Sequence, residues 1–225
     1  MDSNERNEKI YNGVGALSAF YLSVSYIVGI IIFLIVLKYP EITNDLEKIE
    51  LLLNYKNIIF FTNILMYILF GPIFVLFIIS LKEKFKETKC ILLTFSTVIG
   101  FIWAGSLVAS GMIANAAIEP VLSMYKTDVV KASFFWQIID TVSMGIGNGN
   151  GEILGGIFTL FLCISALMNN KLNKFINIVG IIVGIIGILS VIPMLNSLGG
   201  IFGITQIVWF ICVGIMFLSK DKKRV

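Results

Sequence analysis

The chain has 225 residues, of which 57% are hydrophobic and only 14% are charged. Ordinary soluble domains carry roughly a quarter of charged residues, so this composition excludes a typical soluble domain and indicates an integral membrane protein. The formal net charge of +3 is small, and no segment combines dense lysine and arginine with interleaved aromatic residues, which argues against a nucleic-acid partner.

Histidine is absent from the chain, and Cys90, Cys163 and Cys212 lie far apart within apolar runs. The lack of histidine excludes Ser-His-Asp and Cys-His catalysis, zinc sites with histidine ligands, and haem held by a histidine. The scattered cysteines favour small buried side chains over a disulfide framework. We therefore expect no metal and no cofactor, and a non-enzymatic function is favoured over catalysis.

Six apolar runs are long enough to form membrane-crossing helices, each of which needs about 20 residues. They cover about residues 14–37, 57–81, 90–116, a run ending near 168, 175–195 and 200–219. The sequence thus predicts an all-α fold, a polytopic transmembrane helix bundle of six spans over residues 14–219. The pair Gly71-Pro72 predicts a kink in the second span, because proline removes a backbone donor.

The segment between the first two runs, residues 38–56, is mixed in charge. It predicts a short surface helix around residues 44–53, capped by an asparagine or aspartate. The first run is not typical of a cleaved signal peptide, because Lys38-Tyr39-Pro40 follows it in place of a small-residue cleavage site.

Residues 129–147 predict an amphipathic helix in addition to the six spans. Its polar face holds Ser133, Gln137, Asp140 and Thr141, and its apolar face holds Phe135, Ile138 and Val142. A seventh span here would bury Lys131 and would place the basic C-terminus outside. We therefore expect this helix to lie on the outer membrane surface or to dip into the membrane.

The distribution of lysine and arginine predicts the orientation. Twelve of the seventeen basic residues fall in segments 1–13, 82–89, 169–174 and 220–225, and five fall in the segments between them. Because cytoplasmic loops carry the excess of basic residues, we expect both termini in the cytoplasm. Residues 1–13 then form a cytoplasmic N-terminal segment, and residues 220–225 form a basic cytoplasmic tail.

Small residues recur at helical spacing in several runs. Examples are the series Ser106, Ser110 and Ala114, and the pairs Gly180/Gly184 and Gly151/Gly155. In lipid, small residues let helix backbones approach closely. The pattern predicts close packing within the bundle or, as the alternative, a homo-oligomer that forms through these faces.

One polar segment stands out in residues 140–152, with a carboxylate at each end and four glycines and two asparagines between them. Polar backbone and charges are costly in hydrocarbon, so such a segment is expected to line a cavity or a watery site. The candidate ligand-binding residues are Asp140, Asn148, Asn150, Glu152, Gln206, Asn115 and Trp136. The alternative is a solvated loop with exposed acids and turn-forming asparagines. The three tryptophans, at 103, 136 and 209, could also be interfacial anchors.

Three functions remain open. The first is a protein that binds or transports a small amphiphilic or apolar ligand. The second is an intramembrane hydrolase that uses Asp140 and Glu152, although the GxGD motif of intramembrane aspartyl proteases is not matched, because "GNGE" ends in glutamate. The third is a structural or accessory subunit. Membrane lipid is the expected partner in each case.

Several segments resemble a family of uncharacterised bacterial polytopic membrane proteins known only as a domain of unknown function. They are "GFIWAGSLVASGMIAN" at residues 100–115, "MYKTD", Trp136, "GIGNGNGEILGGIF", "LNKFINIVGIIVGIIGILSVIP" and "QIVWF". The resemblance covers most of the chain after residue 14. It implies a location in the bacterial cytoplasmic membrane, and it implies no activity, substrate or site.

Overall fold

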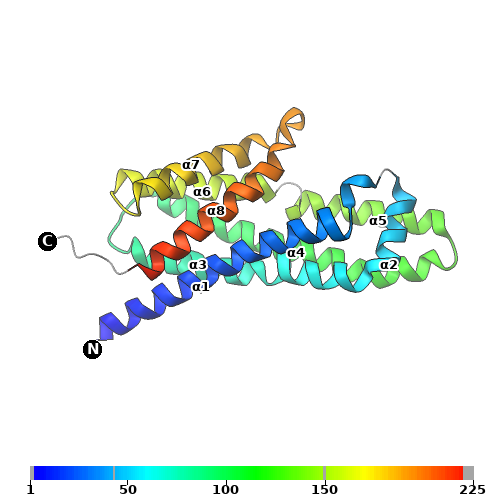
Figure 1. Cartoon of the computed structure of the whole chain (residues 1–225), viewed down its shortest axis with the longest axis horizontal. Coiled ribbons are helices and arrows are strands. Elements are labelled where there is room, and N and C mark those ends of the chain that lie inside the picture. Colours follow the sequence, from blue (N-terminus) through cyan, green and yellow to red (C-terminus); the bar gives the residue numbers. More distant parts are fainter. Residues whose placement is uncertain (1–2, 43, 149–150, 220–225) are drawn as a thin grey trace. The chain divides into compact units, whose positions relative to one another are not determined.

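The computed structural model describes residues 3–42, 44–148 and 151–219. Every regular element in these ranges is a helix, which confirms the predicted all-α fold (Figure 1). The α-helices are α1 (Ser3–Ile31), α2 (Asp45–Asn63), α3 (Phe70–Lys84), α4 (Ile91–Tyr125), α5 (Val129–Ser143), α6 (Gly151–Met168), α7 (Lys174–Leu189) and α8 (Leu198–Leu218). Short π-helical turns follow three of them, η1 (Ile32–Val36), η3 (Ile64–Ile68) and η4 (Met144–Asn148), and 3-10 turns form η2 (Tyr39–Glu41) and η5 (Pro193–Leu195).

Five helical segments are long and apolar enough to cross a membrane, which is compatible with an integral membrane protein. They are Asn4–Val36, Leu46–Lys84, Ile91–Tyr125, Val129–Met168 and Leu198–Leu218. The fourth contains residues 149–150, which lie outside the described residues. The predicted fifth span corresponds to α7, which is apolar but only 16 residues long.

Two helix boundaries differ from the sequence-based expectation. The predicted surface helix is present, and the side chain of its N-cap Asn44 accepts a hydrogen bond from the backbone of Glu47 at 2.9 Å. It does not end near residue 53, however, because α2 continues to Asn63 across a kink at Tyr55 (φ −124°, ψ 21°). Likewise, α4 continues beyond residue 116, through Pro120, to Tyr125.

A π-helical turn lies just before Pro72, where the sequence predicts a kink. In η3 the backbone N–H of Leu69 reaches five residues back to the carbonyl of Ile64, at 2.8 Å. Such turns are a usual way for a helix to absorb a local mismatch in its hydrogen-bond ladder. After this turn α3 begins at Phe70, so that Pro72 lies in its first turn, where the missing donor costs little.

The chain divides into two compact units. Unit 1 comprises Met1–Val24, Pro72–Ala104 and Glu152–Val225, and unit 2 comprises Ser25–Gly71 and Gly105–Gly151. Both α1 and α4 contribute residues to each unit.

Unit 1 is packed around a cluster of aromatic rings. The ring of Phe74 lies 4.6 Å from that of Trp103 and 5.0 Å from that of Phe158, and the ring of Phe77 lies 5.9 Å from that of Trp209. Both of these tryptophans are buried, with at most 1% of their surface exposed. They are therefore core residues and not interfacial anchors.

Small residues bring the helices of unit 1 into close contact. A β-carbon on Gly184 of α7 would lie 2.8 Å from the carbonyl oxygen of Gly156 on α6, and one on Gly156 would lie equally close to the carbonyl of Gly184. Helix α8 packs along α7 as a hairpin partner (Figure 1). The Gly180/Gly184 pattern thus serves packing within the chain.

Unit 2 has an aliphatic core of its own. It consists of the buried residues Leu37, Ile49, Leu52, Ile59, Ala117, Ile118, Val121, Leu122 and Ala132. These residues come from the end of η1, from α2, from the last turns of α4 and from α5, and α2 and α5 lie in direct contact. This core positions the candidate functional site.

Candidate functional site

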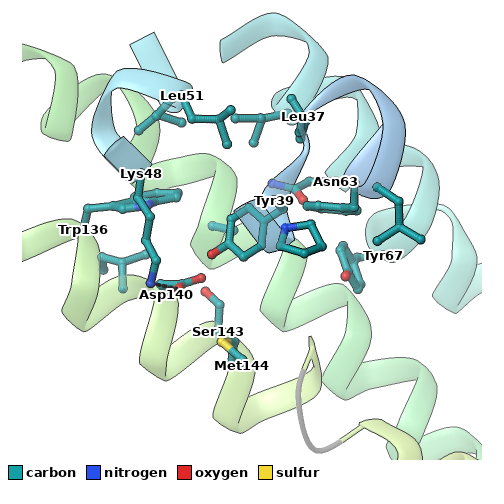
Figure 2. A pocket seen from close by; sticks show the side chains of 17 residues that line it. Leu37, Tyr39, Lys48, Leu51, Asn63, Tyr67, Trp136, Asp140, Ser143 and Met144 are labelled. Carbon is teal, nitrogen blue, oxygen red and sulfur yellow. Dashed lines mark ion pairs between the residues drawn. The ribbon is translucent and has the colours of Figure 1, made fainter. Parts of the chain in front are cut away.

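A cavity of about 280 Å³ lies within unit 2 (Figure 2). It is lined by Phe33, Leu34, Leu37, Tyr39, Pro40, Lys48, Leu51, Leu52, Ile59, Asn63, Tyr67, Ala114, Trp136, Ile139, Asp140, Ser143 and Met144. Most of this wall is aliphatic or aromatic. Its few polar side chains gather in two places, one on the α2–α5 side and one near the end of α2.

The first polar group is a corner made by Lys48, Asp140 and Ser143. The Nζ atom of Lys48 on α2 lies 3.8 Å from Oδ2 of Asp140 on α5, and these side chains are 27% and 22% exposed. Figure 2 shows Lys48 reaching down to Asp140, with the Ser143 hydroxyl beside the carboxylate. We call these three residues the polar corner.

Ser143 is the most buried member of the polar corner, with 2% of its surface exposed. Its Oγ atom has no hydrogen-bond partner among the described residues. Its backbone carbonyl, in contrast, accepts a hydrogen bond from the hydroxyl of Ser110 on α4 at 2.9 Å. An unsatisfied buried hydroxyl is costly, so this group is suited to meet a polar atom that enters the cavity.

A close approach between α4 and the turn η4, which follows α5, holds the α5 side of the polar corner in place. A β-carbon on Gly147 would lie 2.7 Å from the backbone oxygen of Ser106 and 3.1 Å from Cβ of Ser110. Only glycine allows this contact without a shift of the backbone. Part of the glycine-rich segment therefore has a packing role in unit 2.

The second polar group, at the end of α2, is tied to α4. The side-chain amide of Asn63 donates to Oδ1 of Asn115 at 2.9 Å, and the amide of Asn115 donates to the carbonyl of Phe60 at 3.1 Å. Asn63 and Tyr67 both line the cavity, whereas Asn115 supports the wall from behind. This pair fixes the register of the two helices.

The turn after η1 provides the remaining wall. Lys38 adopts a left-handed conformation (φ 47°) and starts the short helix η2, which places Tyr39 and Pro40 against the cavity. The ring of Tyr39 contacts that of Phe33 edge-on, with the centroids 6.1 Å apart. In Figure 2 Tyr39 lies at the centre of the view, across from Asp140.

The predicted site residues are divided between the units. Asp140 and Trp136 line the cavity, and Asn115 supports it through Asn63. Glu152 and Gln206 belong to unit 1. The side chain of Asn148 and the whole of Asn150 lie outside the described residues.

In unit 1, Glu152 and Gln206 have polar side-chain atoms that are buried between helices. Glu152 Oε2 is buried without a hydrogen-bond partner among the described residues. Gln206 has no exposed surface, and its Oε1 accepts a hydrogen bond from the hydroxyl of Thr159 at 3.5 Å. The small size of Gly199 leaves space beside the Glu152 carboxylate, since a β-carbon there would lie 3.6 Å from Oε1.

The predicted polar face of α5 is divided in the structure. Gln137 and Thr141 are exposed, whereas Ser133 is buried and Asp140 is half-buried at the cavity. On the predicted apolar face, Ile138 is 44% exposed. The helix itself is confirmed, but the face that turns toward the cavity is the one that carries Asp140 and Ser143.

Three of the important side chains were not among the predicted site residues. Lys48 was assigned to a surface helix, Asn63 lies in apolar surroundings without a recognisable motif, and Ser143 lies in the polar segment 140–152 but was not singled out within it. One signal was available, because Ser143 is one helical turn beyond Asp140 and therefore shares its face. The structure contains no group of three or more Cys, Asp or Glu residues in its described part that could hold a metal ion.

Comparison with known proteins shows no matching family model, no matching curated protein and no matching solved structure.

Proposed function

We propose that this chain is an integral membrane protein that binds a small amphiphilic ligand in the cavity of unit 2. The observation that carries the proposal is the make-up of the cavity wall, which is apolar except for a few convergent polar groups. Ligand sites in proteins have this composition, with the apolar wall supplying affinity and the polar groups fixing orientation.

The size of the cavity limits the ligand. An engineered apolar cavity of about 150 Å³ holds one benzene molecule, and the cavity of unit 2 measures about 280 Å³. Drug-sized ligands use cavities of about 300–1,000 Å³. The expected ligand is therefore a short chain or ring system, or one part of a longer lipid-like molecule.

The hydrolase alternative has less support. It requires two acids that act together, whereas Asp140 is the single acid among the described residues that line the cavity. Glu152 belongs to unit 1. The alternative of a docking subunit rests on small-residue faces, and several of these glycines are already packed within the chain.

The location follows from the charge distribution and the family resemblance. Twelve of the seventeen basic residues lie in segments expected on one side of the membrane. We propose a multi-pass protein of the bacterial cytoplasmic membrane with both termini in the cytoplasm. The helical segments that are apolar enough to cross a membrane support the membrane location itself.

Saturable binding of tritiated 1-octanol to the purified protein in lipid nanodiscs tests the proposal. Equilibrium dialysis against empty nanodiscs separates binding from simple partition into lipid. We expect a saturable component for the native chain and a loss of at least tenfold in affinity for Ala114→Phe, because Ala114 lines the cavity.

The matched control is Ala116→Phe, because Ala116 lies on the same helix but is exposed and does not line the cavity. This variant should bind like the native chain. Uptake by the native protein that equals that of empty nanodiscs would show the proposal to be wrong.

A further inference from the structure

The cavity of unit 2 carries a balanced pair of charges. Lys48 and Asp140 face each other in the polar corner, and no other described residue that lines the cavity is charged. The formal charge of the cavity wall is therefore zero. This balance bears on the kind of polar head that the cavity can accept.

We infer that the cavity selects an amphiphile with an uncharged head that both donates and accepts hydrogen bonds, such as an alcohol, a glycerol ester or a primary amide. This inference rests on the proposed function and names its ligand class. The three groups of the polar corner offer an ammonium donor, a carboxylate acceptor and a hydroxyl that can do either.

A charged head fits this site poorly. Either an anionic or a cationic head would add a third charge to a pair that is already compensated, and at a half-buried position an unpaired charge costs more than it does in water. A pure hydrocarbon fits poorly as well, because it would leave the buried Oγ of Ser143 without a partner.

The spacing of the ion pair suits a neutral head. The 3.8 Å between Lys48 Nζ and Asp140 Oδ2 exceeds the usual 2.7–3.2 Å of a direct hydrogen bond. A hydroxyl placed beside the pair can accept from the ammonium and donate to the carboxylate at the same time. The hydroxyl of Ser143, one helical turn from Asp140, can provide a third contact.

The experiment compares 1-octanol, octanoate and octylammonium, which share one alkyl chain and differ in head charge. Each is measured by equilibrium dialysis with the native chain in nanodiscs, and empty nanodiscs serve as the blank for lipid partition. We expect the native chain to bind 1-octanol at least tenfold more tightly than either ion.

Variants of the polar corner should then change the preference in opposite directions. Asp140→Asn changes the formal charge of the cavity wall from zero to +1, so octanoate should become the preferred ligand. Lys48→Gln changes it from zero to −1, so octylammonium should be preferred. Ser143→Ala should weaken 1-octanol binding about tenfold without favouring either ion.

The double variant Lys48→Asp/Asp140→Lys provides a check on folding. It restores the neutral pair with its partners exchanged, so the preference for 1-octanol should return even if a single variant is unstable. Two results would overturn the inference while leaving the cavity as a ligand site. One is native protein that binds either ion as tightly as 1-octanol. The other is an order of affinities for the three compounds that stays unchanged in both single variants. Absence of binding above the blank for all three compounds would instead remove the proposed function.

Discussion

Gly147 in the turn η4, which follows α5, lies so close to α4 that a β-carbon on it would stand 2.7 Å from the backbone oxygen of Ser106. Contacts of this kind hold helices together in lipid, where burial of apolar surface contributes little to association. The same contact fixes the turn of α5 that carries Ser143, and with it one side of the cavity.

Gly147→Ala should destabilise the protein by about 1–3 kcal/mol, the usual cost of forcing an extra carbon into a packed site. The backbone of Ser106 cannot move aside as a flexible side chain can. Thermal unfolding in detergent should show a lower midpoint for this variant. Gly145→Ala is the matched control, because a β-carbon there meets nothing within 4 Å, and it should unfold like the native chain.

Gly156→Ala tests the close contact of α6 and α7 in unit 1. Its β-carbon would lie 2.7 Å from the backbone nitrogen of Ile188, so the two helices must separate. We expect a loss of stability of about 1–3 kcal/mol, again read from thermal unfolding. Gly200→Ala, whose β-carbon meets nothing within 4 Å, should have no such effect; equal effects of the two substitutions would contradict the packing role.

Asn115→Ala should cost about 1–3 kcal/mol, because it removes the acceptor of the buried Asn63 amide and the donor to the carbonyl of Phe60. Removing both asparagines should cost less than the two single losses added together. A double-mutant cycle on the unfolding free energy measures this coupling. Asn57→Ala on exposed α2 surface is the control, and its effect should stay within about 0.5 kcal/mol.

The orientation can be tested by cysteine labelling in a variant whose three native cysteines are replaced by alanine. Ser123→Cys and Lys86→Cys introduce single thiols at exposed positions on α4 and after α3. A membrane-impermeant maleimide applied to intact cells should label the first and not the second. The reverse pattern would place both termini outside, and labelling of both positions would contradict the predicted set of spans.

The sequence was sufficient to predict the helices and their approximate positions. Apolar runs report which segments prefer lipid, and an asparagine or aspartate was expected to cap the helix around residues 44–53, where Asn44 is the cap. The cavity could not be predicted in the same way. Lys48 and Asp140 are far apart in the chain and meet only because α2 and α5 pack together.

Helix pairing of this kind leaves little trace in a membrane sequence. Many small-residue faces are compatible with several partner helices and registers. Side chains that select one register, such as Asn63 and Asn115, belong to no sequence motif that would identify them as a hydrogen-bonded pair. Asp140 and Trp136 were identified because polar or amphipathic residues are rare in apolar runs. Glu152 and Gln206 met the same criterion but belong to the other unit.

The length of α4 has a consequence for how unit 2 is stabilised. Its 35 residues extend over about 52 Å at about 1.5 Å per residue, whereas the hydrocarbon layer is about 30 Å thick. About four turns of α4 therefore lie among lipid headgroups or in water. The turns around Glu119 are suited to that environment, because Glu119 forms an exposed ion pair with Lys56 at 3.2 Å. The proposed topology puts the aliphatic core around Ile49, Leu52 and Val121 at this end, outside the hydrocarbon layer, where the hydrophobic effect would hold it together. Urea, which weakens that effect in water, should accordingly loosen this end of the molecule while the lipid-embedded turns stay folded.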